Sequence, residues 1–292
     1  MNPDVVVVGD LMLDVAVDAP ALATGGDVHG TVIARPGGSG ANAAVWAARA
    51  GARVRFHGRV GDDVTGRVLR DAMTERGVEA ALVVALGRRT GCLLATRVAG
   101  ERSMVADRGA NATVSPEDLP AALEAGAVLV SGYLLFHPTS EPAGLAALDR
   151  ARAGVVAVEA SSWPLVEAYG ASRFLEATSK ATLLLANEDE ARSLTRLDPE
   201  AAAKELSDRY AAVCVKLGPS GVLHAEGGRL THASAPPIEV RDTTGAGDAF
   251  DGALLAALAR GASTEEALDA GCRAGAEAAS SDDAWPPAEA RP

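Results

Sequence analysis

Aromatic side chains are scarce in this sequence, since Phe, Trp and Tyr together make up only 3% of its 292 residues. Hydrophobic residues still reach 48% and charged residues 23%, so the chain can bury a sizeable core. That core must be built mainly from Ala, Val and Leu. A chain of this length forms either one large domain or two smaller ones.

Cysteine is also rare: Cys92, Cys214 and Cys272 lie far apart in the sequence. Their number is odd, and their spacing matches neither a metal site nor a disulfide framework. Chains without such a framework are typical of reducing compartments. We therefore expect a cytoplasmic protein.

Positively charged residues are fewer than negatively charged ones: the chain has 27 Lys and Arg residues and 39 Asp and Glu residues, which gives a net charge of -12. This balance argues against a general nucleic-acid binder or a membrane-surface binder. No apolar run approaches the length of a membrane span. The run Val5–Val8 lacks the basic start and cleavage site of a signal peptide, so it is predicted to be a buried strand.

Aliphatic runs alternate along the chain with segments of helical periodicity. This order predicts an α/β fold with a mostly parallel central sheet, in a single unit that spans residues 1–292. Strands are predicted at residues 4–9, 54–60, 127–131, 155–158, 183–186 and 213–217, and helices at 65–76, 119–124, 142–152, 165–176 and 264–279. The Pro-rich tail, residues 282–292, is predicted to be mobile.

A second, smaller sheet is predicted outside the main one. Residues 93–98 and 103–106 flank a short turn and indicate a β-hairpin. We expect this hairpin to pair with residues 15–17 and 29–34 as a discontinuous β lid, at about residues 12–35 and 90–108. Arg102 beside the turn either faces a substrate or is a solvated charge, and its position alone favours the second interpretation.

The most informative stretch is Asp242-Thr243-Thr244-Gly245-Ala246-Gly247-Asp248-Ala249-Phe250, which follows an extended, Pro-broken segment (residues 235–240) and runs into an apolar-periodic segment. The pattern predicts a strand end, a tight glycine turn and a helix start. The first amides of a helix lack internal partners and carry the positive end of its dipole, so they form an anion site. Asp248 at such a turn suits proton abstraction from a hydroxyl while the amides stabilise a transferring phosphoryl group.

This stretch matches neither familiar phosphate loop. A Walker loop requires a Lys after its second glycine, and none follows here. A dinucleotide fingerprint requires a third glycine where Phe250 stands. These absences leave the Asp-bearing helix start as the feature to explain.

Other polar residues allow two interpretations each. Asp14 is either a carboxylate for substrate hydroxyls or a cap or exposed strand residue, and Asn42 is either a polyol ligand or a helix cap. Asn187 and Glu190 either hold a hydrated magnesium ion or form a capping box. The Gly218-Pro219-Ser220-Gly221 turn either lies against a nucleotide or is only a hairpin turn.

The order and spacing of these motifs resemble the ribokinase/PfkB carbohydrate kinase family over nearly the whole chain. The matching residues are Gly9-Asp10-Leu11-Met12-Leu13-Asp14, Gly37-Gly38-Ser39-Gly40-Ala41-Asn42-Ala43-Ala44, Gly58 to Gly66, Asn187-Glu188-Asp189-Glu190 and the nonamer at 242–250. The resemblance implies a ribokinase-like three-layer sandwich that phosphorylates a hydroxymethyl group of a sugar or nucleoside with ATP. The lid sheet of this family often forms a dimer clasp, and the apolar strands here allow a homodimer through the lid.

The resemblance also implies roles for individual residues. Asp248 would be the general base, and the amides of Gly245, Ala246 and Gly247 would form the anion hole. Sugar binding is the implied role of Asp14, Gly37, Gly38, Asn42 and Arg102. Asn187 and Glu190 would organise Mg²⁺ (through water) and the phosphates, and the nucleotide would contact Lys216, Gly218 and Gly221. A monovalent cation, K⁺, would bind at Asp242 and Thr244.

Two departures from the family pattern bear on the substrate. Glu159-Ala160-Ser161-Ser162 stands where many relatives carry Asp and Asn or Pro. Residues 93–105 contain no aromatic side chain on which a base could stack, although Tyr133 or Phe136 could supply one from elsewhere. Arg97, Arg102 and Arg108 are too scattered in the sequence to indicate a binding site for a sugar phosphate. A neutral monosaccharide is therefore expected, with a nucleoside, or a catalytically inactive sugar-binding protein, as the alternatives. A dehydrogenase is disfavoured because no dinucleotide fingerprint follows Val5–Val8.

Overall fold

The computed structural model describes residues 2–21, 23–98 and 101–287, with the side chains of Glu101 and Arg102 outside that description. A nine-stranded sheet forms its centre, in the order β15-β14-β13-β12-β11-β9-β1-β4-β5. The neighbours from β13 to β5 run parallel, and β14 and β15 are antiparallel. The strands are β1 (Val5–Val8), β4 (Val54–Gly61), β5 (Val78–Ala85), β9 (Ala127–Val130), β11 (Val155–Glu159), β12 (Leu183–Asn187), β13 (Ala212–Lys216), β14 (Val222–Glu226) and β15 (Arg229–Ala233).

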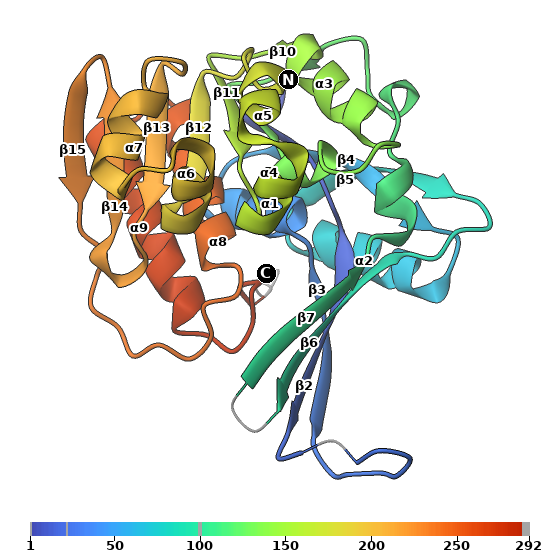
Figure 1. Ribbon diagram of the computed structural model, residues 1–292. Helices are drawn as coiled ribbons and strands as arrows, with labels where there is room; N and C mark the ends of the chain where they lie inside the picture. The colour runs from blue at the N-terminus through green and yellow to red at the C-terminus, as the bar shows by residue number, and fades with distance from the viewer. Residues whose placement is uncertain (1, 22, 99–100, 288–292) are drawn as a thin grey trace.

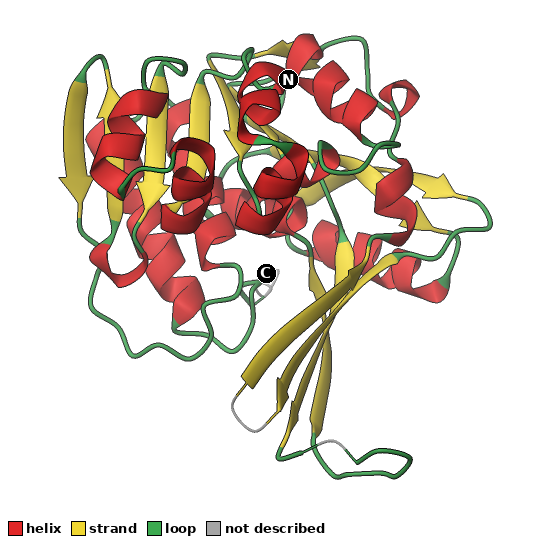
Figure 2. Ribbon diagram, in the orientation of Figure 1, coloured by secondary structure: helices red, strands yellow, loops and turns green. Residues whose placement is uncertain are grey.

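Helices cover both faces of this sheet, which gives three layers (Figures 1 and 2). Alternate side chains of a strand point to opposite faces, so in β1 Val5 and Val7 join one buried cluster and Val6 and Val8 the other. The first cluster is covered by α1 (Ser39–Arg49), α2 (Val64–Glu75), α8 (Ala246–Ala259) and α9 (Thr264–Ala279). The second is covered by α3 (Glu141–Arg150), α4 (Trp163–Tyr169), α5 (Ala171–Ala177), α6 (Glu188–Thr195) and α7 (Pro199–Leu206). The predicted mostly parallel α/β fold is confirmed.

A separate four-stranded sheet projects from the main body (Figure 1). Its order is β3-β2-β6-β7, formed by β2 (Met12–Ala19), β3 (Thr31–Gly37), β6 (Gly91–Val98) and β7 (Glu101–Asp107). The hairpin and its pairing with the two N-terminal strands therefore form as predicted. Because side chains alternate, one face of this sheet carries Asp14, Asp18 and Arg97, and the other carries valines and leucines.

Several local predictions are wrong. Residues 119–124 are not helical, because Pro120 interrupts the segment and Leu123 and Glu124 form β8, which pairs with β10 (Ala151–Arg152). The helix predicted at 165–176 is two helices, α4 and α5, which meet at Gly170 with φ of 95°. Edge strands β5 and β15 were not anticipated.

The segments on either side of the last two helices also differ from expectation. Residues 235–240 belong to no strand, since Pro236 and Pro237 cannot donate the ladder hydrogen bonds. The tail was predicted to be mobile, but residues 282–287 are fixed to the body of the protein by ion pairs and by the buried indole of Trp285, which is 3% exposed. The prediction for residues 288–292 lies outside the described part of the chain.

Candidate active site

The glycine turn before α8 holds its predicted position at the start of a helix. Gly245 adopts the left-handed region with φ of 77° and is the residue before the first turn of α8. A Cβ atom at Gly245 would lie 2.9 Å from Ala284 Cβ, so the close approach of the tail also requires glycine. The Ala246 N–H donates to the Thr243 carbonyl at 3.2 Å, and no backbone acceptor lies within reach of the Gly247 N–H among the described residues.

Asp248 stands in the first turn of α8, and the residue as a whole is only partly buried. Asp248 Oδ1 accepts a hydrogen bond from Ser39 Oγ at 3.0 Å, and Oδ2 accepts one from Asn42 Nδ2 at 2.7 Å. Removal from water raises the pKa of Asp248, while Asn42, Lys216 and Ser39 favour the ionised form. The structure thus brings the predicted base and Asn42 into direct contact.

Asn42 has both ends of its carboxamide occupied. Its Oδ1 accepts the indole N–H of Trp285 at 2.7 Å, and its Nδ2 donates to Asp248. Asn42 lies inside the second turn of α1 and is 4% exposed, so it does not cap the helix. Its first contact is with the candidate base, a role that the sequence did not indicate.

Glu159, at the end of β11, is a site residue that the sequence reasoning did not identify. It is 3% exposed, and its carboxyl group is within hydrogen-bond distance of three serine hydroxyls. The partners are Ser39 at 2.8 and 2.9 Å, Ser161 at 3.1 Å and Ser131 at 3.2 Å. Burial, and then the charge of Asp248, raise the pKa of Glu159. The sequence signal that could have identified Glu159 is its position as an acid at the carboxyl end of a predicted parallel strand, where ligands bind in α/β sheets.

Lys216 and Asp251 form an ion pair beside this group, with Nζ 2.7 Å from Oδ2, in which Asp251 is buried and Lys216 is partly exposed. Asp251 lies one helical turn after Asp248, and Lys216 ends β13. Although burial opposes the lysine's charge, the carboxylates of Asp251 and Glu190 raise its pKa. Lys216 is also close to the glycine turn, since a Cβ at Gly247 would lie 3.3 Å from its Nζ.

Asn187 and Glu190 form the capping box that was one of their two interpretations. Asn187 Oδ1 accepts the Glu190 N–H at 2.9 Å, and Glu190 Oε2 accepts the Asn187 N–H at 2.8 Å. Glu190 is 6% exposed, and burial raises its pKa. Because the cap uses only one carboxylate oxygen, the group can still accept a hydrogen bond from a metal-bound water. Among the described residues, no cluster of three or more His, Cys, Asp or Glu side chains could hold a metal directly.

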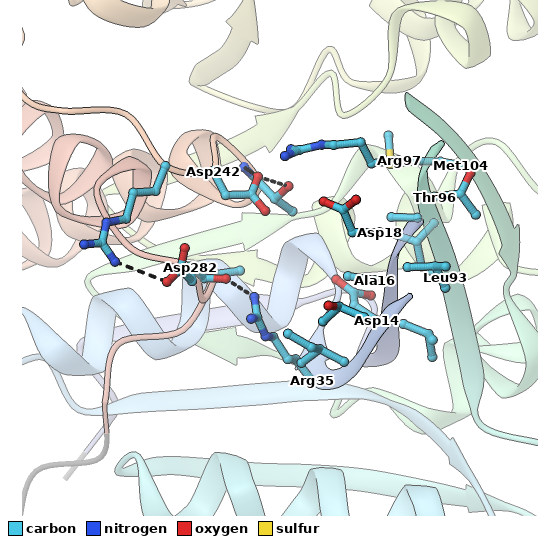
Figure 3. A pocket seen from close by; sticks show the side chains of 18 of the residues that line it. Asp14, Ala16, Asp18, Arg35, Leu93, Thr96, Arg97, Met104, Asp242 and Asp282 are labelled. Carbon is cyan, nitrogen blue, oxygen red and sulfur yellow. Dashed lines mark hydrogen bonds and ion pairs between the residues drawn. The ribbon is translucent and has the colours of Figure 1, made fainter. Parts of the chain in front are cut away.

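A pocket of about 310 Å³ opens between the four-stranded sheet, the segment before α8 and the tail (Figure 3). Asp14 and Asp18 of β2 line it from one side, and Asp242 and Asp282 from the other. Asp14 Oδ1 is buried without a hydrogen-bond partner among the described residues, so it can accept a hydrogen bond from a bound ligand. Burial, and then the charge of Asp248, raise the pKa of Asp14 to about 7.

The other predicted residues fall around this centre. Gly37 lies directly beside Asp14, because a Cβ there would lie 2.1 Å from Asp14 Oδ2 and would displace that carboxyl group, and Gly38 has φ of 98°. Asp242 Oδ1 accepts hydrogen bonds from the N–H and hydroxyl of Thr244 at 2.9 and 2.7 Å. Gly218 is the first residue of the turn η4 (Gly218–Ser220) and Gly221 follows it, with φ of 57° and 94°. The side chain of Arg102 lies outside the described part.

Comparison with known proteins identifies the family. The profile described as "pfkB family carbohydrate kinase" matches residues 2–291. The chain belongs to the pfkB family of carbohydrate kinases. It is 32% identical over 250 residues to aminoimidazole riboside kinase of Salmonella typhimurium, covering 80% of this chain and 76% of that protein.

Ribokinase of Bacillus subtilis is 30% identical over 273 residues, covering 91% of this chain and 89% of that enzyme. The crystal structure of adenosine kinase from Sinorhizobium meliloti superposes with a TM-score of 0.88 at 25% identity, covering 98% of this chain and 96% of that one. The expected fold and enzyme class are thus confirmed: this pfkB protein is an ATP-dependent sugar kinase.

Membership in the pfkB family leaves the acceptor open, since its relatives include kinases named for sugars and for nucleosides. No helix in the described ranges is long and apolar enough to cross a membrane. What distinguishes this pfkB chain from the expected pattern is the buried Glu159 with its three serines, set beside Asp248.

Proposed function

We propose that this protein transfers the γ-phosphoryl group of ATP to a hydroxyl of a small neutral monosaccharide, with Asp248 as the general base. The observation that carries the proposal is the placing of Asp248: it stands at the N-terminal turn of α8, partly accessible, with donors fixed on both carboxylate oxygens. Those donors hold the carboxylate in one orientation. They also favour its ionised form, which is the form that can accept a proton.

In the proposed reaction the sugar hydroxyl oxygen attacks the γ-phosphorus, and its proton passes to Asp248 as the new O–P bond forms and the bond to ADP breaks. Charge that develops on the transferring group is stabilised by the amides of Gly245, Ala246 and Gly247 and by the positive end of the α8 dipole. Lys216, 2.7 Å from Asp251, adds a fixed positive charge beside this turn. Mg²⁺ would neutralise phosphate charge, held through water by Glu190 next to Asn187.

The acceptor would bind in the pocket between β2, β6 and the tail. The buried Asp14 Oδ1, which has no hydrogen-bond partner within the described ranges, suits a hydrogen bond from a sugar hydroxyl. Arg35 forms an ion pair with Asp283, and Arg241 forms one with Asp282. These aspartates offset the positive charge that the two arginines would offer to an anionic substrate. These features favour a neutral polyol over a sugar phosphate.

A nucleoside is the second candidate, because two of the relatives above are nucleoside kinases by name. The described lining of the pocket includes no aromatic side chain on which a base could stack. Phe136, one of the two rings considered for that purpose, packs against Tyr169 and Phe174 with centroids 5.7 and 6.0 Å away. The monosaccharide therefore remains the first choice.

Two further features are part of the proposal. The four-stranded sheet would act as a lid over the acceptor, and Asp242 with Thr244 would contribute to a K⁺ site beside the anion hole. The face of the lid that points away from the pocket exposes Val32 and Val105 at 65% and 69%, which supports a homodimer through this sheet.

The test is Asp248→Asn, assayed by ADP release against a panel of monosaccharides, sugar acids and nucleosides. We expect kcat to fall at least about 100-fold, since a general base contributes 10²–10⁴-fold. ATP affinity and thermal stability should stay close to those of the wild type. Near-normal turnover of the variant would remove Asp248 from the role of base.

A further inference from the structure

Ser39 Oγ lies between two carboxyl groups, those of Glu159 and Asp248. The oxygen is 2.8 and 2.9 Å from the two oxygens of Glu159 and 3.0 Å from Asp248 Oδ1. A serine hydroxyl carries one proton, so it can donate fully to only one of these groups at a time. If both carboxyl groups were ionised, one of them would face a serine lone pair at hydrogen-bond distance. The geometry therefore requires a second proton within this cluster.

Glu159 is the better holder of that proton. The residue is 3% exposed, and in the described part of the chain its carboxyl group accepts hydrogen bonds from serine hydroxyls alone. Asp248, by contrast, is as a residue only partly buried, and its carboxylate accepts the amide N–H of Asn42. Burial without a cationic partner favours the neutral acid.

The charged groups around the pair do not alter this assignment. Lys216 on β13 is the nearby cation, and its Nζ is bound to Asp251 on α8 at 2.7 Å. Carboxylates at Asp251 and Glu190 and the phenol of Tyr133 add no positive charge, and Arg108 is bound to Asp10 at 2.7 Å. A second negative charge at Glu159 would thus be repelled by Asp248 and Asp251.

We propose that Glu159 remains protonated through turnover and is a positioning residue for Asp248, acting through Ser39. Glu159 Oε1–H donates to Ser39 Oγ, and the Ser39 hydroxyl donates to Asp248 Oδ1. Glu159 Oε2 then accepts from Ser131 and Ser161 at 3.2 and 3.1 Å. This inference rests on the proposed role of Asp248 as base. The proton taken from the sugar goes to Asp248 and leaves to solvent with the products, and the proton of Glu159 is not consumed.

Ionisation of Glu159 would reverse the donor at Ser39 and place a second anion beside the base and the phosphates. The wild-type kcat should therefore decline on the alkaline side as Glu159 loses its proton. Glu159→Gln provides a permanent mimic of the protonated acid, because its amide donates to Ser39 while its carbonyl accepts from Ser131 and Ser161.

The kinetic test compares kcat against pH for the wild type, Glu159→Gln and Glu159→Leu. We expect Glu159→Gln to keep kcat within about threefold of the wild type at neutral pH and to lose the alkaline decline. Glu159→Leu should lower kcat at least about tenfold at every pH, since it breaks the chain to Asp248. A Gln variant as impaired as the Leu variant, or one with an unchanged alkaline decline, would overturn the proposal.

A second readout does not depend on activity. A carboxyl group whose pKa is raised by folding contributes stability that is present below its unfolded pKa and is lost as pH rises through its folded pKa. The Tm of Glu159→Gln minus that of the wild type should therefore increase from pH 5 to pH 9. The control is Glu205→Gln on the exposed face of α7, whose Tm difference should stay flat.

A flat difference for Glu159→Gln would show an ionised Glu159 and defeat the inference, whatever Asp248 does. An increasing difference in a protein whose Asp248→Asn variant keeps its turnover would instead support the protonated Glu159 and defeat only the proposed base.

Discussion

The indole N–H of Trp285 donates to Asn42 Oδ1 at 2.7 Å, although 243 positions separate the two residues. An indole nitrogen is a donor only, so the contact fixes which end of the Asn42 amide faces the tail. The other end, Nδ2, is thereby directed to Asp248 Oδ2. A residue near the end of the chain thus orients the side chain that orients the candidate base.

Trp285→Phe keeps an apolar ring but removes the N–H donor. We expect a loss of about 1–3 kcal/mol in the free energy of unfolding, since Asn42 Oδ1 is left buried without a donor. The kcat should fall as Asn42 gains a second amide orientation. Urea unfolding and steady-state kinetics measure the two effects, and Trp163→Phe, at a Trp that is 47% exposed, is the matched control. Equal behaviour of the two variants would refute the orienting role.

Gly245→Ala should be more damaging than the same change at Gly261. Both residues have left-handed backbones, with φ of 77° and 83°, so each substitution costs about 1–2 kcal/mol of conformational strain. Of the two, Gly245 is where the new Cβ meets another group, 2.9 Å from Ala284 Cβ, whereas at Gly261 nothing in the described part of the chain lies within 4 Å. Thermal unfolding should rank the variants in that order. A Gly245→Ala protein as stable and active as Gly261→Ala would contradict the close approach.

The pH dependence of stability should report on Asp14. Its pKa is raised by burial, and then by Asp248, from 3.8 to about 7. Because the pKa is raised by folding, Asp14 contributes to the stability of the folded protein in full below pH 3.8, and this contribution is lost as the pH rises through 7. Asp14→Asn does not titrate, so its Tm relative to the wild type should increase between pH 4 and pH 8. A decreasing difference would indicate an ionised, stabilised Asp14. The same variant should weaken binding of the true acceptor.

Lys216→Met should be strongly destabilising, because it leaves the carboxylate of Asp251 buried without its partner. Loss of one member of a buried ion pair costs about 3–5 kcal/mol. The double variant Lys216→Met/Asp251→Leu removes both charges and should recover part of that loss in urea unfolding. If the double variant is no more stable than the single one, the pair is not the source of the cost. Affinity for ATP should be reduced in both variants.

The proposed dimer can be tested at Val105, which is 69% exposed on the outer face of the four-stranded sheet. Val105→Glu places a charge in that apolar face and should shift the protein from dimer to monomer in size-exclusion chromatography with light scattering. Val84→Glu on β5, outside that sheet and 39% exposed, is the control and should leave the mass unchanged. A wild type that is monomeric at all concentrations would end this proposal.

Much of the fold was predictable because its signals are local. Continuous aliphatic runs identified the buried parallel strands β1, β4, β9, β11, β12 and β13, and the glycine turn identified the start of α8. The errors occurred where local signals were weak or tertiary contacts intervened: Pro120 ends a helix-like segment, and edge strands β5 and β15 are recognised only by their pairing.

The site divides in the same way. The sequence by itself determined that Gly245 and Asp248 begin a helix, since this depends on neighbours along the chain. Only the tertiary structure decided the partners of Asn42, the fixing of the tail through Trp285, and the meeting of Glu159 with Asp248 at Ser39. Those contacts join residues more than 100 positions apart. The physical reason is that a side chain's burial and hydrogen-bond partners, and so its protonation state, are set by what folding brings next to it.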